Sequence, residues 1–118
     1  MGRLSTHVLD TVTGRPAQGV AIELHRLDAG GHWAVVKSMT TNADGRTDEP
    51  ALSGTAFVPG TYMLSFAVGD YFRASGARTA EPPFLDIVPV RFHLTDANGH
   101  YHVPLLASPW SYSTYRGS

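Results

Sequence analysis

Three histidines and one arginine are the residues of this chain best suited to chemistry. His7 stands in the segment LSTHVLD, Arg46 follows the turn NADG, and His100 and His102 flank a tyrosine in HYH. The last two share one face if this segment is a strand, because side chains along a strand alternate. An imidazole with its ordinary pKa of about 6.5 takes a proton from water at neutral pH. An arginine grips adjacent oxygen and nitrogen atoms of a planar amide and stabilises a developing oxyanion.

Other catalytic signatures are missing from the sequence. There is no serine nucleophile elbow, no phosphate-binding glycine loop and no helical zinc motif. The chain has no cysteine, which excludes disulfides, thiolate zinc sites and cysteine nucleophiles together. Imidazole, guanidinium, hydroxyl and phenol groups remain, and this set suits hydrolysis of a compact, polar, already activated substrate.

The histidine pair also permits a metal-dependent alternative. A catalytic zinc site generally needs three protein ligands, so a third histidine would have to join His100 and His102. The candidates are His7, His25, His32 and His93. No spacing singles one of them out. We therefore expect no cofactor and no metal, and a pair of interface histidines is the simpler interpretation.

The end of the chain is unusual, because most termini are small, polar and frayed. This one ends in HYHVPLLASPWSYSTYRGS, with several aromatic residues, two prolines and an arginine. We expect such an end to be docked against the protein and used.

Short alternating runs predict the elements that must position these residues. Apolar residues alternate with others at 20–25, 62–68 and 88–94, and Gly- and Asn-containing turns separate the runs. This pattern is typical of an antiparallel β-sandwich. The stretch 69–76 lacks the alternation and ends in glycine, which favours one short helix.

The last strands have two contrasting faces. Tyr101, Val103 and Leu105 should point into the core, whereas the opposite face carries a mixture of types: His100, His102, Pro104 and Leu106. The outer face of a sandwich sheet should be well charged. A mixed face is better explained if another subunit covers it, so we infer a homo-oligomer.

The size and charge of the chain further narrow the class of protein and its possible partners. The 118 residues are 42% hydrophobic and 16% charged, which predicts one compact domain over 1–118. The net charge of −1 and the lack of a Lys/Arg block argue against nucleic acid or an anionic membrane as partner. No membrane-spanning run and no signal peptide are visible, so the cytoplasm is the expected compartment.

Three blocks of the sequence together resemble the transthyretin-related 5-hydroxyisourate hydrolases, which share their fold with the carrier transthyretin. The blocks are LSTHVLD with the following GRPA, the turn and arginine NADGR, and HYHVPLL continuing through SP to the terminal YRGS. The resemblance covers the full length, and YRGS is highly specific to the enzyme branch. The middle, around PPFLD, matches loosely.

The resemblance implies an all-β, transthyretin-like sandwich of two four-stranded sheets with one short helix. The implied assembly is a homotetramer, a dimer of dimers made by strand pairing, with the sites in a central channel. The family's catalytic residues fall on His7, Arg46 and His102. Its substrate-binding residues fall on Ser111, Tyr115, Arg116 and Ser118.

The implied substrate is a small molecule, 5-hydroxyisourate, and the product is 2-oxo-4-hydroxy-4-carboxy-5-ureidoimidazoline. We expect His7 or His102 to activate a water that attacks a cyclic amide, with Arg46 and Arg116 holding the heterocycle. The other histidine or Tyr115 would protonate the departing nitrogen. Sequence leaves open which histidine is the base. The alternatives are a transthyretin-like carrier using the tetramer channel, a plain β-sandwich interaction domain, and a metal-dependent hydrolase.

Overall fold

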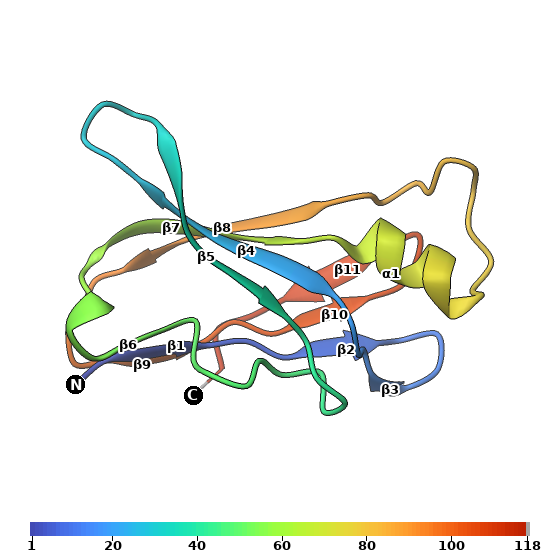
Figure 1. Ribbon diagram of the computed structural model, residues 1–118, viewed down its shortest axis with the longest axis horizontal. Helices are drawn as coiled ribbons and strands as arrows, with labels where there is room; N and C mark the ends of the chain where they lie inside the picture. Colours follow the sequence, from blue (N-terminus) through green and yellow to red (C-terminus); the bar gives the residue numbers. More distant parts are fainter. Residues whose placement is uncertain (118) are drawn as a thin grey trace.

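The computed structural model describes residues 1–117, which form two layers of strands and one α-helix (Figure 1). The elements in chain order are β1 (Arg3–Ser5), β2 (Val8–Asp10), β3 (Arg15–Pro16), β4 (Ala21–Leu27), β5 (Trp33–Thr40), β6 (Leu52–Ser53), the 3-10 turn η1 (Gly54–Ala56), β7 (Gly60–Phe66), α1 (Val68–Ser75), β8 (Val88–Leu94), β9 (His100–His102), β10 (Leu105–Ala107) and β11 (Tyr112–Thr114). Among these residues no helix is long and apolar enough to cross a membrane.

The first layer is an antiparallel sheet with the strand order β5-β4-β7-β8. The apolar residues of the alternating runs face inward, and they lie opposite one another across the central strands. Ile22 is paired with Phe66 and Leu24 with Leu64, and all four side chains are buried. The predicted alternation of the strands is therefore confirmed, and its apolar face forms one half of the core.

The second layer is built from two long, broken strands. β1 pairs in parallel with β9, and β2 pairs in parallel with β10. The register is the same on both sides of the break, since Ser5 lies opposite His102 and Leu9 opposite Leu106. The segments 3–10 and 100–107 thus run side by side, with β6 and β3 on one flank and β11 on the other. The predicted all-β sandwich with one helix is confirmed, but the break divides the second layer into a three-stranded sheet, β6-β1-β9, and a four-stranded sheet, β11-β10-β2-β3.

Burial alternates strictly along the first of these strands. The side chains that point into the core are those of Leu4, Thr6, Val8 and Asp10. Two of these residues, Thr6 and Asp10, are polar. Arg3, Ser5, His7 and Leu9 point outward. Tyr101, Val103 and Leu105 are buried as predicted. Pro104 was expected on the outer face with His102 and Leu106, but it is buried at the irregular step between β9 and β10. There Thr114 of β11 donates a hydrogen bond to the Pro104 carbonyl at 2.7 Å.

The predicted short helix is present as α1, and Gly76 ends it in the left-handed conformation with φ of 82°. One boundary was wrong, because Val68 was expected to continue the alternation of β7. Instead Ala67 leaves the extended conformation and Val68 begins the helix. The Gly69 N–H donates to the Asp86 carbonyl at 2.9 Å, which ties the first turn of the helix to the loop before β8.

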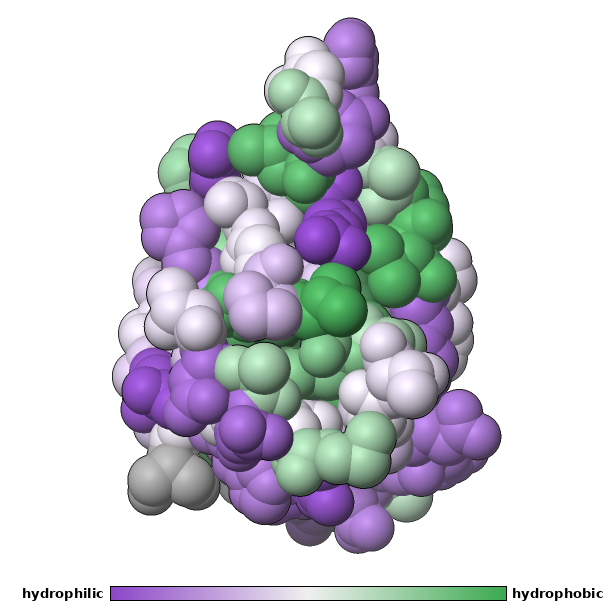
Figure 2. All heavy atoms as spheres, turned by 90° about the vertical axis from the view of Figure 1, so that its left-hand side faces the viewer, coloured by the Kyte–Doolittle hydropathy of each residue, from purple (hydrophilic) through white to green (hydrophobic). Residues whose placement is uncertain are grey.

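The N-terminus lies at the end of the sandwich opposite α1 (Figure 1). Figure 2 looks at this end, with the β4–β5 hairpin projecting at the top. Hydrophobic side chains reach the surface in its middle and toward its right-hand edge, and hydrophilic ones gather above, below and to the left of them. The C-terminal segment is docked as predicted, because the Gly117 N–H donates to the His102 carbonyl at 2.7 Å.

Candidate functional site

His7 and Arg46 are brought together by backbone pairing, although 38 residues separate them in the chain. His7 lies at the break between β1 and β2, where it forms an isolated antiparallel bridge with Arg46. The Val8 N–H donates to the Gly45 carbonyl at 2.8 Å, which fixes the turn against the strand. The His7 side chain itself is hydrogen-bonded through Nε2 to the Asp44 carbonyl at 2.8 Å.

The turn that delivers Arg46 is held by the side chain of Asn42. Its Oδ1 accepts hydrogen bonds from the N–H groups of Asp44 at 2.9 Å and Arg46 at 3.2 Å. Its Nδ2 donates to Asp48 at 3.0 Å. Asparagine favours such a turn because its side chain mimics the backbone two residues on. Gly45 supplies the left-handed step, with φ of 74°.

His102 reaches the same outer face through the parallel pairing of β9 with β1. This pairing sets His102 directly opposite Ser5, and Ser5 Oγ shares a hydrogen bond of 2.8 Å with His102 Nδ1. On its other side the ring lies against the C-terminal segment, since a Cβ atom at Gly117 would come within 2.8 Å of His102 Cδ2. The chain end therefore helps to place the imidazole.

A polar hollow of about 400 Å³ opens beside these residues. It is lined by Arg3, Ser5, Arg46, His100, Tyr101 and His102. Burial lowers the pKa of His102 below its ordinary value, and the positive charges of Arg46 and of protonated His7 lower it further. His102 therefore stays neutral at pH 7, while the cationic lining attracts an anionic or oxygen-rich molecule.

The Asp44 carbonyl determines which nitrogen of His7 is basic. A carbonyl oxygen only accepts hydrogen bonds, so His7 Nε2 must carry a proton to make this bond. In the neutral imidazole the free lone pair is then on Nδ1. Protonation at Nδ1 would strengthen the bond to the carbonyl, because the donor would become charged.

Three other predicted site residues, Ser111, Tyr115 and Arg116, do not line this hollow. Ser111 is exposed at the turn between β10 and β11, where its backbone carbonyl and Oγ contact Ser108. Tyr115 and Arg116 line an adjacent hollow of about 260 Å³ between the two layers. The Arg116 guanidinium lies 4.2 Å above the Tyr101 ring, which lines both hollows. Ser118 lies outside the described residues.

Sequence reasoning missed several residues that shape the site. Ser5 and Asn42 contact the functional groups directly or through the backbone, and their types alone gave no signal. Ser113 was also missed: it lies opposite Leu106, and directly opposed residues share a face. Leu106 shares its face with His102, so Ser113 also lies on this outer face, and the role of Ser111 stays a prediction.

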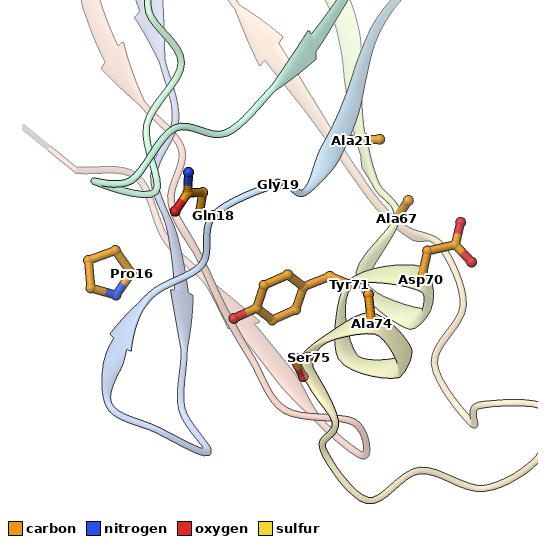
Figure 3. A pocket seen from close by; sticks show the side chains of 9 residues that line it. All are labelled: Pro16, Gln18, Gly19, Ala21, Ala67, Asp70, Tyr71, Ala74 and Ser75. Carbon is orange, nitrogen blue, oxygen red and sulfur yellow. The ribbon is translucent and has the colours of Figure 1, made fainter.

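A larger hollow, about 570 Å³, lies elsewhere, between α1 and the segment that joins β3 to β4 (Figure 3). Tyr71 reaches across it from α1, and no histidine or arginine lines it. The Tyr71 hydroxyl donates to the buried carboxylate of Asp10 at 2.8 Å. Burial, followed by this contact with Asp10, raises the pKa of Tyr71 to about 12. We assign this region to packing, because the Tyr71 hydroxyl is already bound to Asp10 and no histidine or arginine accompanies it.

Within the described part of the chain, no group of three His, Asp or Glu side chains is placed to hold a metal ion. His25 and His32 lie in or beside the β4–β5 hairpin, where they approach Glu23 and Asp28 respectively. They are therefore separated from His102 in the fold.

Comparison with known proteins places this chain among close relatives. It matches the HIUase/Transthyretin family over residues 4–117. It is 55% identical to 5-hydroxyisourate hydrolase 2 of Rhizobium meliloti, over 99% of this chain and 97% of the relative.

Solved structures agree with this match. An (S)-allantoin synthase is 49% identical with a TM-score of 0.93, and the chain covers 44% of that longer protein. The 5-hydroxyisourate hydrolase of Klebsiella pneumoniae is 34% identical over 100% of both chains, with a TM-score of 0.81. Sea bream transthyretin in complex with thyroxine is 31% identical, with a TM-score of 0.87, over 98% of this chain and 94% of its own.

Proposed function

The chain belongs to the HIUase/Transthyretin family, and from that premise we propose that it hydrolyses 5-hydroxyisourate to 2-oxo-4-hydroxy-4-carboxy-5-ureidoimidazoline. Its relatives from Rhizobium meliloti and Klebsiella pneumoniae are 5-hydroxyisourate hydrolases, which supports the assignment. The reaction adds one water across a cyclic amide bond and needs no cofactor.

The observation that carries the proposal is the meeting of two imidazoles and one guanidinium on one outer face. His7 pairs with Arg46 through the backbone, and Arg46 lines the same hollow as His102. All three belong to different parts of the chain, and a surface sheet gives no structural reason to gather them. Acid–base groups beside a cation are what hydrolysis of an amide requires.

In the first step we assign the base to His7 Nδ1. This atom holds the free lone pair of the neutral ring, because Nε2 is bound to the Asp44 carbonyl. Nδ1 takes a proton from water as the water oxygen attacks the ring carbonyl carbon. The carbonyl oxygen then becomes an oxyanion, and Arg46 stabilises it. One such contact is worth about 10²–10³-fold in rate.

In the second step the tetrahedral intermediate collapses and the carbon–nitrogen bond breaks. The departing nitrogen needs a proton, and His102 carries it there from protonated His7. His102 suits a relay, because its lowered pKa makes it release a proton readily. Both histidines end neutral, and the product has gained the elements of one water.

A carrier function is the competing assignment, since sea bream transthyretin was solved with thyroxine bound. The lining of the hollow argues for a different ligand. Two arginines and two histidines contribute to it, and such a surface suits a small polar heterocycle better than a large apolar one. Assays of 5-hydroxyisourate decay and of thyroxine binding separate the hydrolase from the carrier.

We further propose that residues 1–118 form one domain, and that the protein assembles as a homotetramer, a dimer of dimers. The free edges of β8 and β11 are available for strand pairing. The outer face with His7, Leu9 and Leu106 is half-buried in the protomer, and a second dimer would cover it. Sedimentation at several concentrations tests the assembly. The cytoplasm expected from the sequence stays a prediction.

The deciding experiment generates 5-hydroxyisourate in place with urate oxidase and follows its decay optically. Wild-type protein should accelerate the decay in proportion to its concentration. His7→Ala, Arg46→Ala and His102→Ala should each lose most of this acceleration, about 10²-fold or more, while the assembly is retained. His32→Ala is the matched control, because its side chain is 83% exposed and does not line the hollow.

A well-folded tetramer that does not accelerate the decay would contradict the hydrolase assignment, and tight thyroxine binding by that tetramer would establish a carrier. Loss of activity after treatment with a chelator would instead support a metal-dependent enzyme. Deleting residues 115–118 should abolish activity without unfolding the protein, and full activity in that variant would remove the C-terminus from the site.

A further inference from the structure

We propose that Ser5 is a positioning residue of this site, which holds the His102 ring by Nδ1 and thereby presents Nε2 to the substrate. The inference rests on the proposed hydrolase function and assigns it a residue that the sequence did not single out. Ser5 neither takes nor gives a proton in the reaction scheme. Its role is to fix the orientation of one imidazole.

The contacts on the two edges of the ring carry this proposal. Ser5 and His102 are directly opposed in the parallel β1–β9 pair, and the hydroxyl lies 2.8 Å from Nδ1. The opposite edge faces Gly117, whose hypothetical Cβ would lie 2.8 Å from Cδ2 and 3.3 Å from Cγ. Ser5 thus contacts Nδ1 and Gly117 packs against Cδ2, so Nε2 is the ring nitrogen left to meet the substrate.

A hydrogen bond at this place decides between two ring orientations. The terminal torsion of histidine is broad and roughly two-fold, so a half-turn exchanges Nδ1 with Cδ2 and Nε2 with Cε1. The packing of Gly117 against the ring discriminates weakly between the two states, since the ring has nearly the same outline in both. The Ser5 hydroxyl discriminates strongly, because a C–H group cannot replace the nitrogen as its partner. Without Ser5, Cε1 would occupy the position of Nε2 in part of the molecules.

The two histidines are thus oriented by different hydrogen-bond partners. The Asp44 carbonyl binds His7 through Nε2 and leaves Nδ1 free, whereas Ser5 binds His102 through Nδ1 and leaves Nε2 free. Fixed partners on the non-reacting nitrogen are the usual way of setting the tautomer and direction of a functional histidine. Proton transfer between the rings and the substrate depends on both orientations being held.

The test uses two variants of nearly equal shape, Ser5→Thr and Ser5→Val, which differ by one hydroxyl. Both residues suit a strand, so folding should be matched. Ser53→Ala is the control, because Ser53 lies in β6 opposite Arg3 and no histidine neighbours it in the register. The first measurement is the imidazole ¹⁵N spectrum of the free protein, with His102 assigned by comparison with His102→Gln. We expect the valine variant alone to change the His102 nitrogen shifts.

The second measurement is steady-state kinetics with 5-hydroxyisourate. Ser5→Val should lower kcat by about 10- to 100-fold with little change in KM, because misplacement of a reacting group impairs chemistry more than binding. Ser5→Thr should restore most of kcat. In a His102→Gln background the Thr and Val variants should have equal rates, since Ser5 acts through His102.

Equal kcat values and equal His102 spectra for the Thr and Val variants would overturn the proposal. A kcat difference that persists without His102 would overturn it as well, because Ser5 would then act elsewhere. Failure of the hydrolase assignment looks different: wild-type protein would leave the substrate untouched, while the His102 spectrum still responded to the Ser5 hydroxyl.

Discussion

The backbone of Gly117 lies so close to the imidazole of His102 that a Cβ atom at position 117 would meet Cδ2 at 2.8 Å and Cβ at 3.2 Å. Real side chains do not approach this closely, so position 117 needs glycine for contact and not for backbone conformation. The penultimate residue of the chain therefore bounds the site, and the docked terminus has a steric explanation.

Gly117→Ala should lower kcat by about tenfold or more, because either the ring or the chain end must move. The stability of the protein should change by less than about 0.5 kcal/mol, since the segment is peripheral. Kinetics and urea denaturation measure the two effects. Gly60→Ala is the control, because its new Cβ would meet the flexible Arg26 side chain at 3.3 Å and Tyr62 Cε1 at an ordinary contact distance of 3.5 Å. Unchanged kcat in Gly117→Ala would show that the contact is not needed.

Gly45→Ala should damage both stability and activity. Gly45 has φ of 74°, and an added Cβ would come within 2.5 Å of the Val8 carbonyl oxygen and 3.2 Å of His7 Cδ2. Backbone strain alone is worth about 1–3 kcal/mol. Gly14→Ala separates strain from collision, because Gly14 has the same φ but no atom within 4 Å of a new Cβ. A Gly45 variant as stable and active as the Gly14 variant would contradict this account.

The lowered pKa of His102 predicts a specific dependence of stability on pH. The unfolded chain binds the His102 proton near pH 6.5, whereas the folded chain binds it only at lower pH. The free energy of unfolding therefore falls as the pH drops from about 6.5 to the lowered pKa of His102. Above a pH of about 6.5 the contribution of His102 to this free energy is constant. His102→Gln should remove that part of the slope. Urea denaturation at several pH values checks it, and an identical slope in the variant would reject the lowered pKa.

Tyr71→Phe should destabilise the protein without affecting the reaction. Asp10 is only 2% exposed, and its carboxylate accepts hydrogen bonds from Tyr71 and from the N–H groups of Val12 and Thr13. Loss of the phenol hydroxyl leaves one buried carboxylate oxygen without a hydrogen-bond donor, which should lower the free energy of unfolding by about 1–3 kcal/mol. Thermal denaturation and kcat are the two measurements. A fall in kcat without a fall in stability would mean that the large hollow beside α1 takes part in function.

Most of the architecture could be predicted because local pattern and burial agree. The inward residues of β4, β7 and β8 follow the two-residue period of a strand, and Gly76 ends α1 where glycine is the natural stop. The boundary at Val68 could not be predicted, since its apolar side chain suits either element. Only the contact of Gly69 with the loop before β8 decides that the helix starts there.

The sequence by itself determined the kinds of groups that we propose for the chemistry: His7, Arg46 and His102 are recognisable by type and motif, and so is the unusual chain end. Tertiary structure decided how they meet and which of their ring nitrogens are hydrogen-bonded. The pairing of His7 with Arg46, the parallel register that sets Ser5 against His102, and the Asp44 carbonyl on His7 all join residues far apart in the chain. Hydrogen bonds of this kind depend on the register of strands, and no local pattern encodes which distant carbonyl or hydroxyl a side chain will find.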